Sequence, residues 1–280
     1  MEVARRIDAV HLVSVDSMQV YRGMDIGTAK PTAAERAEVP HHCLDLVDPT
    51  DEFAVVDFRE AYTAALASIE RAAGRALLVG GTGLYHRLTI DEFDLPGQWP
   101  ETLARLEAQP DTTSLHDELV RLDPAAAAKT EPGNRRRILR ALEVTIGSGR
   151  PFSSYGPGLD SYADSPVVQI GLARPRSELS DRIAARVHQM IDIGLVEEVE
   201  GLRAAGFSRT ARQALGYKEI LQHLDGEIGK DEAIELIITR TRQFAVRQER
   251  WFRRDPRIRW FDVGNDADTA LSTVLAALGS

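Results

Sequence analysis

Three short apolar runs constrain the fold of this chain more than any other feature of its sequence. They cover residues 11–15, 76–79 and 167–172, and each is followed by polar or glycine-rich residues. A helical pattern lies between the first two runs, at residues 55–73. Strands that alternate with helices predict an α/β fold with a parallel sheet, in which ligand sites form at the carboxyl ends of the strands.

The middle of the chain departs from this alternation. Three helical patterns follow one another there, and a stretch rich in Gly, Ser and Pro at residues 147–157 then forms a return linker. We therefore expect a helical insertion at residues 95–155, carried by an α/β core of residues 1–94 and 156–280. The helical patterns cover residues 101–108, 114–122 and 135–146.

Two features of the C-terminal half are predicted to be structural. An apolar stripe at helical spacing, from residue 179 to residue 190, predicts a core-facing helix with Ser177 or Ser180 as its N-cap. Residues 226–231 end in Gly-Lys-Asp and superficially resemble a phosphate-binding P-loop. Their glycines are too close together and Asp231 replaces the required hydroxyl, so we expect a turn between two helices.

The charge of the chain is unevenly distributed. Its net charge of −9 argues by itself against a nucleic-acid partner, yet eight arginines lie between residues 240 and 259, opposed only by Glu249 and Asp255. A helix expected at residues 231–254 would place several of them on one face. A solvated basic face is the alternative, but so many arginines with so little acid favour phosphate contact. The arginines that share this face are Arg240, Arg247, Arg250 and Arg254, and a second cluster consists of Arg135, Arg136, Arg137 and Arg140.

The cysteine content and the hydropathy of the chain indicate in which cell compartment it is expected. Cys43 is the only cysteine, so no internal disulfide can form. The sequence has no run of about 18 apolar residues that could span a membrane, and its first residues do not form a secretory signal. We therefore expect a cytoplasmic protein without a membrane partner.

Polar residues follow the first two apolar runs directly. Asp16 follows the first, and a carboxylate at a strand end can accept a proton from a substrate nucleophile. An Asp–Ser turn or helix cap is the more common role of such a residue. Residues 80–83 are Gly-Gly-Thr-Gly, which lets the backbone approach a ligand closely and offers the Thr82 hydroxyl as donor and acceptor. A tight strand-to-helix turn explains these glycines equally well.

Several other polar residues have both a functional and a structural interpretation. Lys30 and Lys218 are candidate phosphate contacts, although a lone lysine is usually solvated. His41 and His42 lie beside the cysteine, but adjacent histidines rarely face one site, so metal binding is disfavoured. Trp251 could stack on a base, although a packing tryptophan is more common.

Six segments, in this order and spacing, resemble the bacterial tRNA dimethylallyltransferases, also called tRNA isopentenyltransferases. The resemblance covers nearly the whole chain, and DSMQVYRGMDIGTAKP at residues 16–31 is its most specific part. The other segments are PHHCLDLVDP (40–49), LVGGTGLY (78–85), RALEV (140–144), QALGYKE (213–219) and TRQFAVRQERWFRRD (241–255).

The resemblance implies a P-loop-NTPase-like parallel sheet core with a helical insertion domain that contacts tRNA. It implies transfer of a dimethylallyl group from dimethylallyl diphosphate to the N6 amine of the adenosine next to the anticodon. The adenosine would be flipped into a channel, where it meets the donor, and Mg²⁺ would assist the diphosphate. The implied partners are the tRNA anticodon stem-loop and dimethylallyl diphosphate, and we expect the protein to be a monomer.

The resemblance also assigns roles to individual residues. Asp16 would take the proton of the adenosine amine, and Thr82 would orient the flipped base. No residue is assigned as a metal ligand. The residues expected to bind tRNA are Asp16, Ser17, Met18, Gln19, Thr82, Arg136, Arg137, Arg140, Gln213, Gly216, Tyr217, Lys218, Arg247, Gln248, Arg250 and Arg253, with Lys218 near the diphosphate.

Three positions depart from the family pattern. Arg136 stands where the family usually has Gln in a Gln-Arg-x-x-Arg pattern, a change that would shift a base contact toward phosphate. Leu103 replaces a tRNA-contacting arginine of some members, and Val246 replaces a frequent basic residue.

The beginning of the sequence differs from the family pattern more seriously. The family opens with a strand and the loop G-P-T-x-x-G-K-[ST], whereas this sequence opens with MEVARRIDAVHLVSVD. We therefore expect the first strand and the P-loop, about 20 residues in all, to be absent, together with the usual donors to the diphosphate and to Mg²⁺.

Three interpretations of this difference remain open. The sequence could be a truncated copy of that of an active transferase, for example with a misplaced start. The chain could instead be a truncated and catalytically inactive tRNA- or RNA-binding protein, or an adenine-nucleotide prenyltransferase. The basic helix and the insertion favour tRNA over a free nucleotide. For the sequence as it stands, we expect weak binding of the anticodon stem-loop and little or no transferase activity.

Overall fold

The computed structural model describes residues 1–91, 95–156, 158–159, 161–264 and 267–279, without the side chains of 267–269. The chain divides into two compact units, one made of Met1–Ile90 with Asp164–Ser280 and one made of Asp91–Ala163. The sequence placed the boundaries of the insertion at residues 94/95 and 155/156. Residue 94 lies outside the described residues, and these boundaries stay a prediction.

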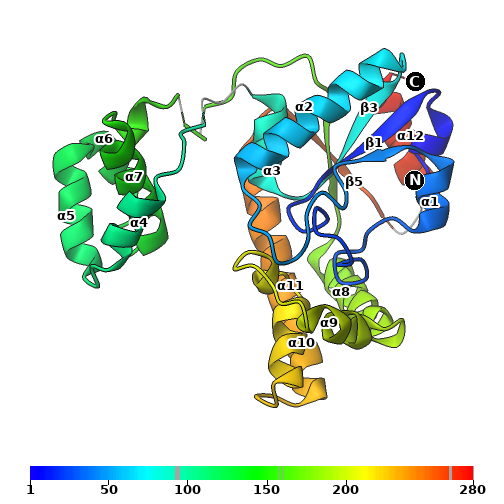
Figure 1. The fold of residues 1–280 in the computed structure, drawn as a ribbon. Helices are drawn as coiled ribbons and strands as arrows, with labels where there is room; N and C mark the ends of the chain where they lie inside the picture. The colour runs from blue at the N-terminus through cyan, green and yellow to red at the C-terminus, as the bar shows by residue number, and fades with distance from the viewer. Residues whose placement is uncertain (92–94, 157, 160, 265–266, 280) are drawn as a thin grey trace. The chain divides into compact units, whose positions relative to one another are not determined.

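Parallel strands form the centre of the first unit (Figure 1). Strand β1 (Val10–Val15) lies between β2 (His41–His42) and β3 (Arg75–Gly80), and both pairings are parallel. Strands β4 (Gln169–Ala173) and β5 (Ile258–Asp262) form a second parallel pair. The predicted parallel α/β fold is therefore confirmed. Two strands were not predicted, because β2 has only two residues and arginine interrupts the apolar pattern of β5.

Short and long helices cover the strands of this unit. After the 3-10 turn η1 (Ala4–Arg6) and β1, helix α1 (Ala33–Glu38) begins with a capping box between Thr32 and Glu35. Helix α2 (Val55–Arg71) confirms the helical pattern at 55–73, and its Phe58 stacks on Tyr85 of α3 (Gly83–Ile90). Helix α12 (Ala267–Leu278) packs Leu275 and Leu278 against the apolar side chains of η1 and β1.

The rest of the first unit is a helical layer with its own core. It contains α8 (Arg176–Asp192), α9 (Leu195–Arg203), the 3-10 turn η3 (Ala211–Gln213), α10 (Tyr217–Leu224) and α11 (Lys230–Phe252). Val187, Leu195, Tyr217 and Ile237 are among the side chains buried between these helices and the segment that follows β1. A core of this size removes enough apolar surface from water to hold that segment in place.

Two predictions for this layer are confirmed and one is wrong. The stripe from residue 179 to residue 190 buries Ile183 and Val187, and the residues between α10 and α11 form the expected turn. The N-cap of α8 is Pro175, so Ser177 and Ser180 lie inside the helix. Pro175 has the non-helical backbone of an N-cap, with φ −53° and ψ 137°, and no side chain caps this helix.

The second unit, residues 91–163, is helical. Side chains of Asp111, Asp123 and Asn134 cap three of its helices, and Gly149 ends the last α-helix with φ 71°. Leu115, Leu119 and their neighbours form its core. The helices predicted from sequence are confirmed. The elements are α4 (Pro100–Glu107), α5 (Thr112–Leu122), α6 (Pro124–Ala127), α7 (Arg135–Ser148) and the 3-10 turn η2 (Phe152–Ser154).

In the parts of the chain that the structure describes, every helix is too short or too polar to cross a membrane.

Candidate active site

Strands β1 and β3 end side by side, and this places two sequence motifs at one edge of the sheet. Val15 pairs with Gly80 in parallel register, and the Thr82 N–H donates to Val15 O at 3.3 Å. The Thr82 hydroxyl oxygen accepts the Ser17 N–H at 3.0 Å and lies 3.3 Å from the Ser17 hydroxyl, to which it donates. The two stretches that follow the first two apolar runs are therefore joined directly, although 65 positions separate Ser17 from Thr82.

The two oxygens of the Asp16 carboxylate have different environments. Oδ1 accepts the N–H groups of Met18 at 2.8 Å and Gln19 at 3.3 Å, which is the turn that Asp residues commonly form. Oδ2 accepts no hydrogen bond from the described residues. Burial raises the pKa of Asp16, and the two backbone hydrogen bonds oppose that effect only in part. The turn and the catalytic interpretation are thus compatible, because one oxygen holds the backbone and the other is left as a proton acceptor.

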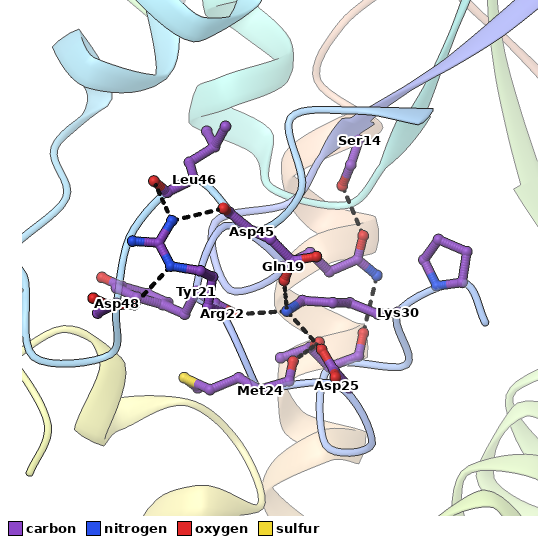
Figure 2. A network of polar contacts seen from close by, with 12 residues as sticks. Ser14, Gln19, Tyr21, Arg22, Met24, Asp25, Lys30, Asp45, Leu46 and Asp48 are labelled. Carbon is purple, nitrogen blue, oxygen red and sulfur yellow. Dashed lines mark hydrogen bonds and ion pairs between the residues drawn. The ribbon is translucent and has the colours of Figure 1, made fainter. Parts of the chain in front are cut away.

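Gln19 holds the segment after Asp16 from both sides. Its Oε1 accepts the Ser14 hydroxyl at 2.7 Å, and its Nε2 donates to Thr28 O at 3.0 Å and Ala29 O at 3.3 Å (Figure 2). Both the oxygen and the nitrogen of the Gln19 amide are therefore hydrogen-bonded within the protein. Ser14 was not singled out from sequence, although a hydroxyl inside an apolar strand is an available signal.

The C-terminal part of α11 lies against the Gly-Gly-Thr-Gly turn. Gln248 Nε2 donates to Gly81 O at 2.9 Å, and a β-carbon on Gly81 would lie 2.0 Å from that nitrogen. A β-carbon on Gly83 would lie 2.2 Å from Nε1 of Trp251. The glycines are thus required by the close approach of a helix. Trp251 packs on this turn, which is the more common of its two predicted roles.

A basic hollow lies on the last turns of α11. Arg247 and Arg250 are exposed, and Arg253 donates to Glu249 and stacks over the ring of Trp260 at 4.6 Å. Arg240 is not available for a phosphate contact in the same way, because its guanidinium pairs with the buried Glu219. The hollow measures about 360 Å³ and is lined by Arg176, Val246, Glu249, Arg250, Arg253 and Arg254.

The segment at residues 213–219 combines buried and accessible residues. Tyr217 is fully buried and donates its hydroxyl to Glu198, so its side chain is a core group with no exposed surface for a ligand. Gly216 starts α10 with φ 92°, a conformation that favours glycine. Lys218 donates to Gln213 Oε1 at 3.2 Å, and these two side chains remain accessible.

Glu198 is an anchor that the sequence did not reveal. Its Oε2 accepts the N–H groups of Asp25 at 3.0 Å and Ile26 at 2.8 Å, and its Oε1 accepts that of Gly27 at 3.3 Å as well as the Tyr217 hydroxyl. A Glu on a predicted helix has no sequence signal for such a role, because its backbone partners lie more than 170 positions away.

Lys30 is not the phosphate contact that the sequence suggested. Its side chain is only 1% exposed, and Nζ donates to Tyr21 O, Asp25 Oδ1 and Asp45 Oδ1. An ammonium group has three donors, so none is left for a ligand.

The arginines of the second unit differ in their availability. Arg136 and Arg137 are exposed on the first turn of α7. Arg140 donates to Glu143, Pro96 O and Gly97 O, and so fixes the segment that precedes α4 against α7. Arg135 donates to backbone carbonyls at the end of α4. The first two are therefore the better candidates for contact with a phosphate.

The described residues do not form a cluster of metal-ligating side chains. They contain no group of three or more His, Cys, Asp or Glu that could hold a metal ion. His42 Nε2 lies 3.0 Å from His11 Nδ1, and His41 contacts Val39 O, so the adjacent histidines face different partners.

Comparison with known proteins gives a consistent picture. The family model for IPP transferase matches residues 19–255. The tRNA dimethylallyltransferase of Kineococcus radiotolerans is 49% identical over 92% of this chain and 82% of its own length, and that of Geobacter metallireducens is 47% identical over 98% and 91%. Among solved structures, the full-length tRNA isopentenylpyrophosphate transferase of Bacillus halodurans has a TM-score of 0.70 at 38% identity, covering 99% of this chain and 89% of that one. A eukaryotic dimethylallyltransferase acting on tRNA has a TM-score of 0.79 at 25% identity, covering 98% and 73%.

Proposed function

The chain belongs to the IPP transferase family, and we propose that it transfers a dimethylallyl group from dimethylallyl diphosphate to the N6 amine of the adenosine next to the anticodon. It is a tRNA dimethylallyltransferase, an enzyme that prenylates tRNA. The finer assignment of donor, atom and position depends on one observation above all. Asp16 has an oxygen without a hydrogen-bond partner among the described residues, beside Thr82 at the joined ends of β1 and β3.

The proposed chemistry is a substitution at the first carbon of the dimethylallyl group. The N6 lone pair forms the new N–C bond, the C–O bond to diphosphate breaks, and the diphosphate leaves with that electron pair. Because the adenine amine is a poor nucleophile, its proton is taken by Asp16 Oδ2 during attack. Burial raises the pKa of Asp16, so its ionised form is a stronger base than that of an ordinary aspartate.

Thr82 and the segment after Asp16 would hold the adenosine. The Thr82 hydroxyl already accepts the Ser17 N–H. Because a hydroxyl is both a donor and an acceptor, it could also hydrogen-bond to the edge of the adenine base. Extrusion of a base costs a few kcal/mol and is least costly from a loop that is already single-stranded. An anticodon loop therefore suits a site that must receive a flipped base.

The tRNA backbone would be bound by exposed arginines. Arg247 and Arg250 lie on α11 and Arg253 is its C-cap, and Arg136 and Arg137 offer further cations on α7. Phosphate contacts position a nucleic acid without reading its sequence, and screening keeps the overall negative charge from preventing them. Gln213 and Lys218 are accessible and remain candidates, whereas Gly216 and Tyr217 support them from within the core. We propose that the enzyme acts in the cytoplasm as a monomer.

Isotope transfer from labelled dimethylallyl diphosphate to tRNA tests this proposal. The purified chain is incubated with tRNA, with the anticodon stem-loop alone, or with AMP, and the products are digested and analysed by mass spectrometry. The proposed function predicts label on the N6 amine of the adenosine beside the anticodon and none on AMP, in contrast to the little or no transfer expected from the sequence alone. Label on AMP instead of tRNA, or binding of tRNA without transfer, would contradict the proposal. Light scattering of the free protein tests the monomer.

A further inference from the structure

The partners of Lys30 belong to two separate parts of the chain. Nζ lies 2.5 Å from Tyr21 O and 2.8 Å from Asp25 Oδ1, both in the segment that follows β1, and 2.6 Å from Asp45 Oδ1, which follows β2 (Figure 2). Removal of an ammonium ion from water is costly unless it is paired and hydrogen-bonded. Lys30 is therefore held in one place, and it holds the two segments together in turn.

Asp45 extends this connection to the segment that carries Asp16 and Gln19. Its second oxygen pairs with Arg36, and its backbone N–H donates to Gln19 O at 3.2 Å. Burial alone would raise the pKa of Asp45, but hydrogen bonds from Lys30 and Arg36 outweigh it and keep that pKa below its usual range. The carboxylate therefore stays charged and paired at neutral pH.

Gln19 connects the same two regions through its side chain. Its amide donates to Thr28 O and Ala29 O, the two residues before Lys30, while its carbonyl accepts the Ser14 hydroxyl in β1. Gln19 N–H in turn donates to the Asp16 carboxylate. A continuous series of short contacts thus leads from the Lys30 ammonium to the side chain of Asp16.

The backbone around Lys30 is held in an unfavourable conformation. Ala29 has φ 51° and Asp45 has φ 54°, both in the left-handed region that non-glycine residues rarely adopt. Such conformations persist only where surrounding contacts determine them. Both residues lie directly beside the Lys30 contacts, so these contacts are among those that hold the conformation.

From this arrangement we propose that Lys30 is a positioning residue for prenyl transfer, which fixes the segment carrying Asp16 and Gln19 by joining Tyr21, Asp25 and Asp45. The inference rests on the proposed function, because it gives Asp16 the role of base. Lys30 does not touch the substrate. It acts through the backbone of residues 16–30, and its loss would misplace the base while leaving the tRNA-binding arginines in position.

Two variants separate positioning from simple loss of stability. Lys30→Met leaves Asp25 without its cation and Asp45 with Arg36 alone, and the double variant Lys30→Met/Asp45→Asn also removes the Asp45 charge. A matched control is Arg240→Met, which removes the cation from the buried Glu219 in the same unit but touches none of residues 16–30. Hydrogen exchange of each folded protein is measured by mass spectrometry, together with kcat and the affinity for the anticodon stem-loop.

If Lys30 is a positioning residue, its variants should change amide exchange only in the segment it fixes, and should lower kcat more than affinity for the stem-loop. In the double variant, amide exchange across residues 17–30 should rise by about tenfold or more, while that of α10 and α11 stays unchanged. A base displaced by about 1 Å should lower kcat about 100-fold, whereas affinity for the stem-loop should change less than about threefold. Arg240→Met should raise exchange in α10 and α11 and leave residues 17–30 as they are.

Two results would overturn the inference. Unchanged exchange in residues 17–30 of both Lys30 variants would show that Lys30 does not fix the segment. A uniform rise across the unit, with kcat and affinity falling together, would show a purely structural role. If the wild-type chain transfers nothing to tRNA, the proposed function fails, but the exchange comparison still decides whether Lys30 fixes this segment.

Discussion

The side-chain amide of Gln248 lies over Gly81 so closely that no β-carbon fits between them. Nε2 donates to Gly81 O at 2.9 Å, and an alanine β-carbon at this position would be 2.0 Å from the same nitrogen. The contact joins the end of the longest helix to the turn that carries Thr82. The arrangement of the proposed base-binding turn therefore depends on a residue 167 positions away.

Gly81→Ala tests this close approach. The added methyl group must displace the Gln248 side chain, so we expect a lower kcat and a loss of stability of about 1–3 kcal/mol, measured by urea unfolding. Gln248→Ala in the same chain should relieve the clash and recover part of both losses. Gly201→Ala is the control, because it lies within α9 with open space around it and should stabilise the protein by about 0.5–1 kcal/mol. Equal losses in Gly81→Ala with and without Gln248 would argue against the contact.

Asp16→Asn should separate catalysis from stability. The Asn oxygen can still accept the Met18 and Gln19 N–H groups, but the side chain cannot take a proton, so we expect kcat to fall about 10²–10⁴-fold with tRNA affinity nearly unchanged. Since the folded pKa of Asp16 is raised, its ionisation opposes folding as pH rises through that pKa. The variant should therefore be at least as stable as the wild type at neutral pH. Full turnover by Asp16→Asn would exclude the general-base role.

The acid limb of the pH–rate profile should reflect the same environment. Only the ionised form of Asp16 can accept a proton, so turnover should fall as pH decreases, with a midpoint above that of an ordinary aspartate. Measurement of kcat with saturating tRNA from neutral pH downward checks this. A profile that stays flat into the range of an unperturbed carboxyl would contradict the burial argument.

Thr82→Val removes one hydroxyl with little change of shape. It leaves the Ser17 N–H without its acceptor, which should cost about 1–3 kcal/mol and displace the segment beside Asp16. Thr82→Ser keeps the hydroxyl and is the matched control. We expect kcat to fall much further in the valine variant than in the serine variant. Similar kinetics in the two would show that the hydroxyl has no part in positioning.

His42 should make the fold sensitive to mild acid. Burial lowers the pKa of His42 first, and the nearby charges of His11 and His41 lower it further. As pH falls below about 6.5, the unfolded chain takes up a proton that the folded chain resists, so stability decreases from that pH downward. His42→Asn should reduce this slope in urea unfolding between pH 7 and 5, whereas the exposed His188→Asn should not. An unchanged slope in His42→Asn would contradict the assignment.

Two arginines of α7 should respond differently to removal. Arg137 is exposed, so Arg137→Gln should weaken tRNA binding. The slope of log affinity against log salt concentration should become shallower by about one, which corresponds to one phosphate contact. Arg140 is bonded to Glu143, Pro96 O and Gly97 O, so Arg140→Gln should mainly destabilise the helical unit. Filter binding over a salt series and thermal unfolding distinguish the two effects. An equal salt slope for wild type and Arg137→Gln would remove Arg137 from the interface.

Local patterns along the chain determine much of this protein. Apolar runs of the right length predict β1, β3 and β4, and helical spacing predicts α2, α7 and α11. Because parallel strands in register end at the same edge, Asp16 and Thr82 could be expected near each other. These features depend on residues that are neighbours in sequence or on a general rule of sheet geometry.

Only the tertiary structure decided how the long polar side chains are used. Lys30, Tyr217 and Arg240 each suggested a surface role, yet all three are bonded to carboxylates of the protein itself. The physical reason is that the partner of a charge or hydroxyl determines its role, and these partners lie between 5 and 21 positions away. Gln248 and Gly81 are 167 positions apart. Spacing along the chain places a residue on a strand or helix, whereas packing alone determines whether its polar atoms face water, substrate or another side chain.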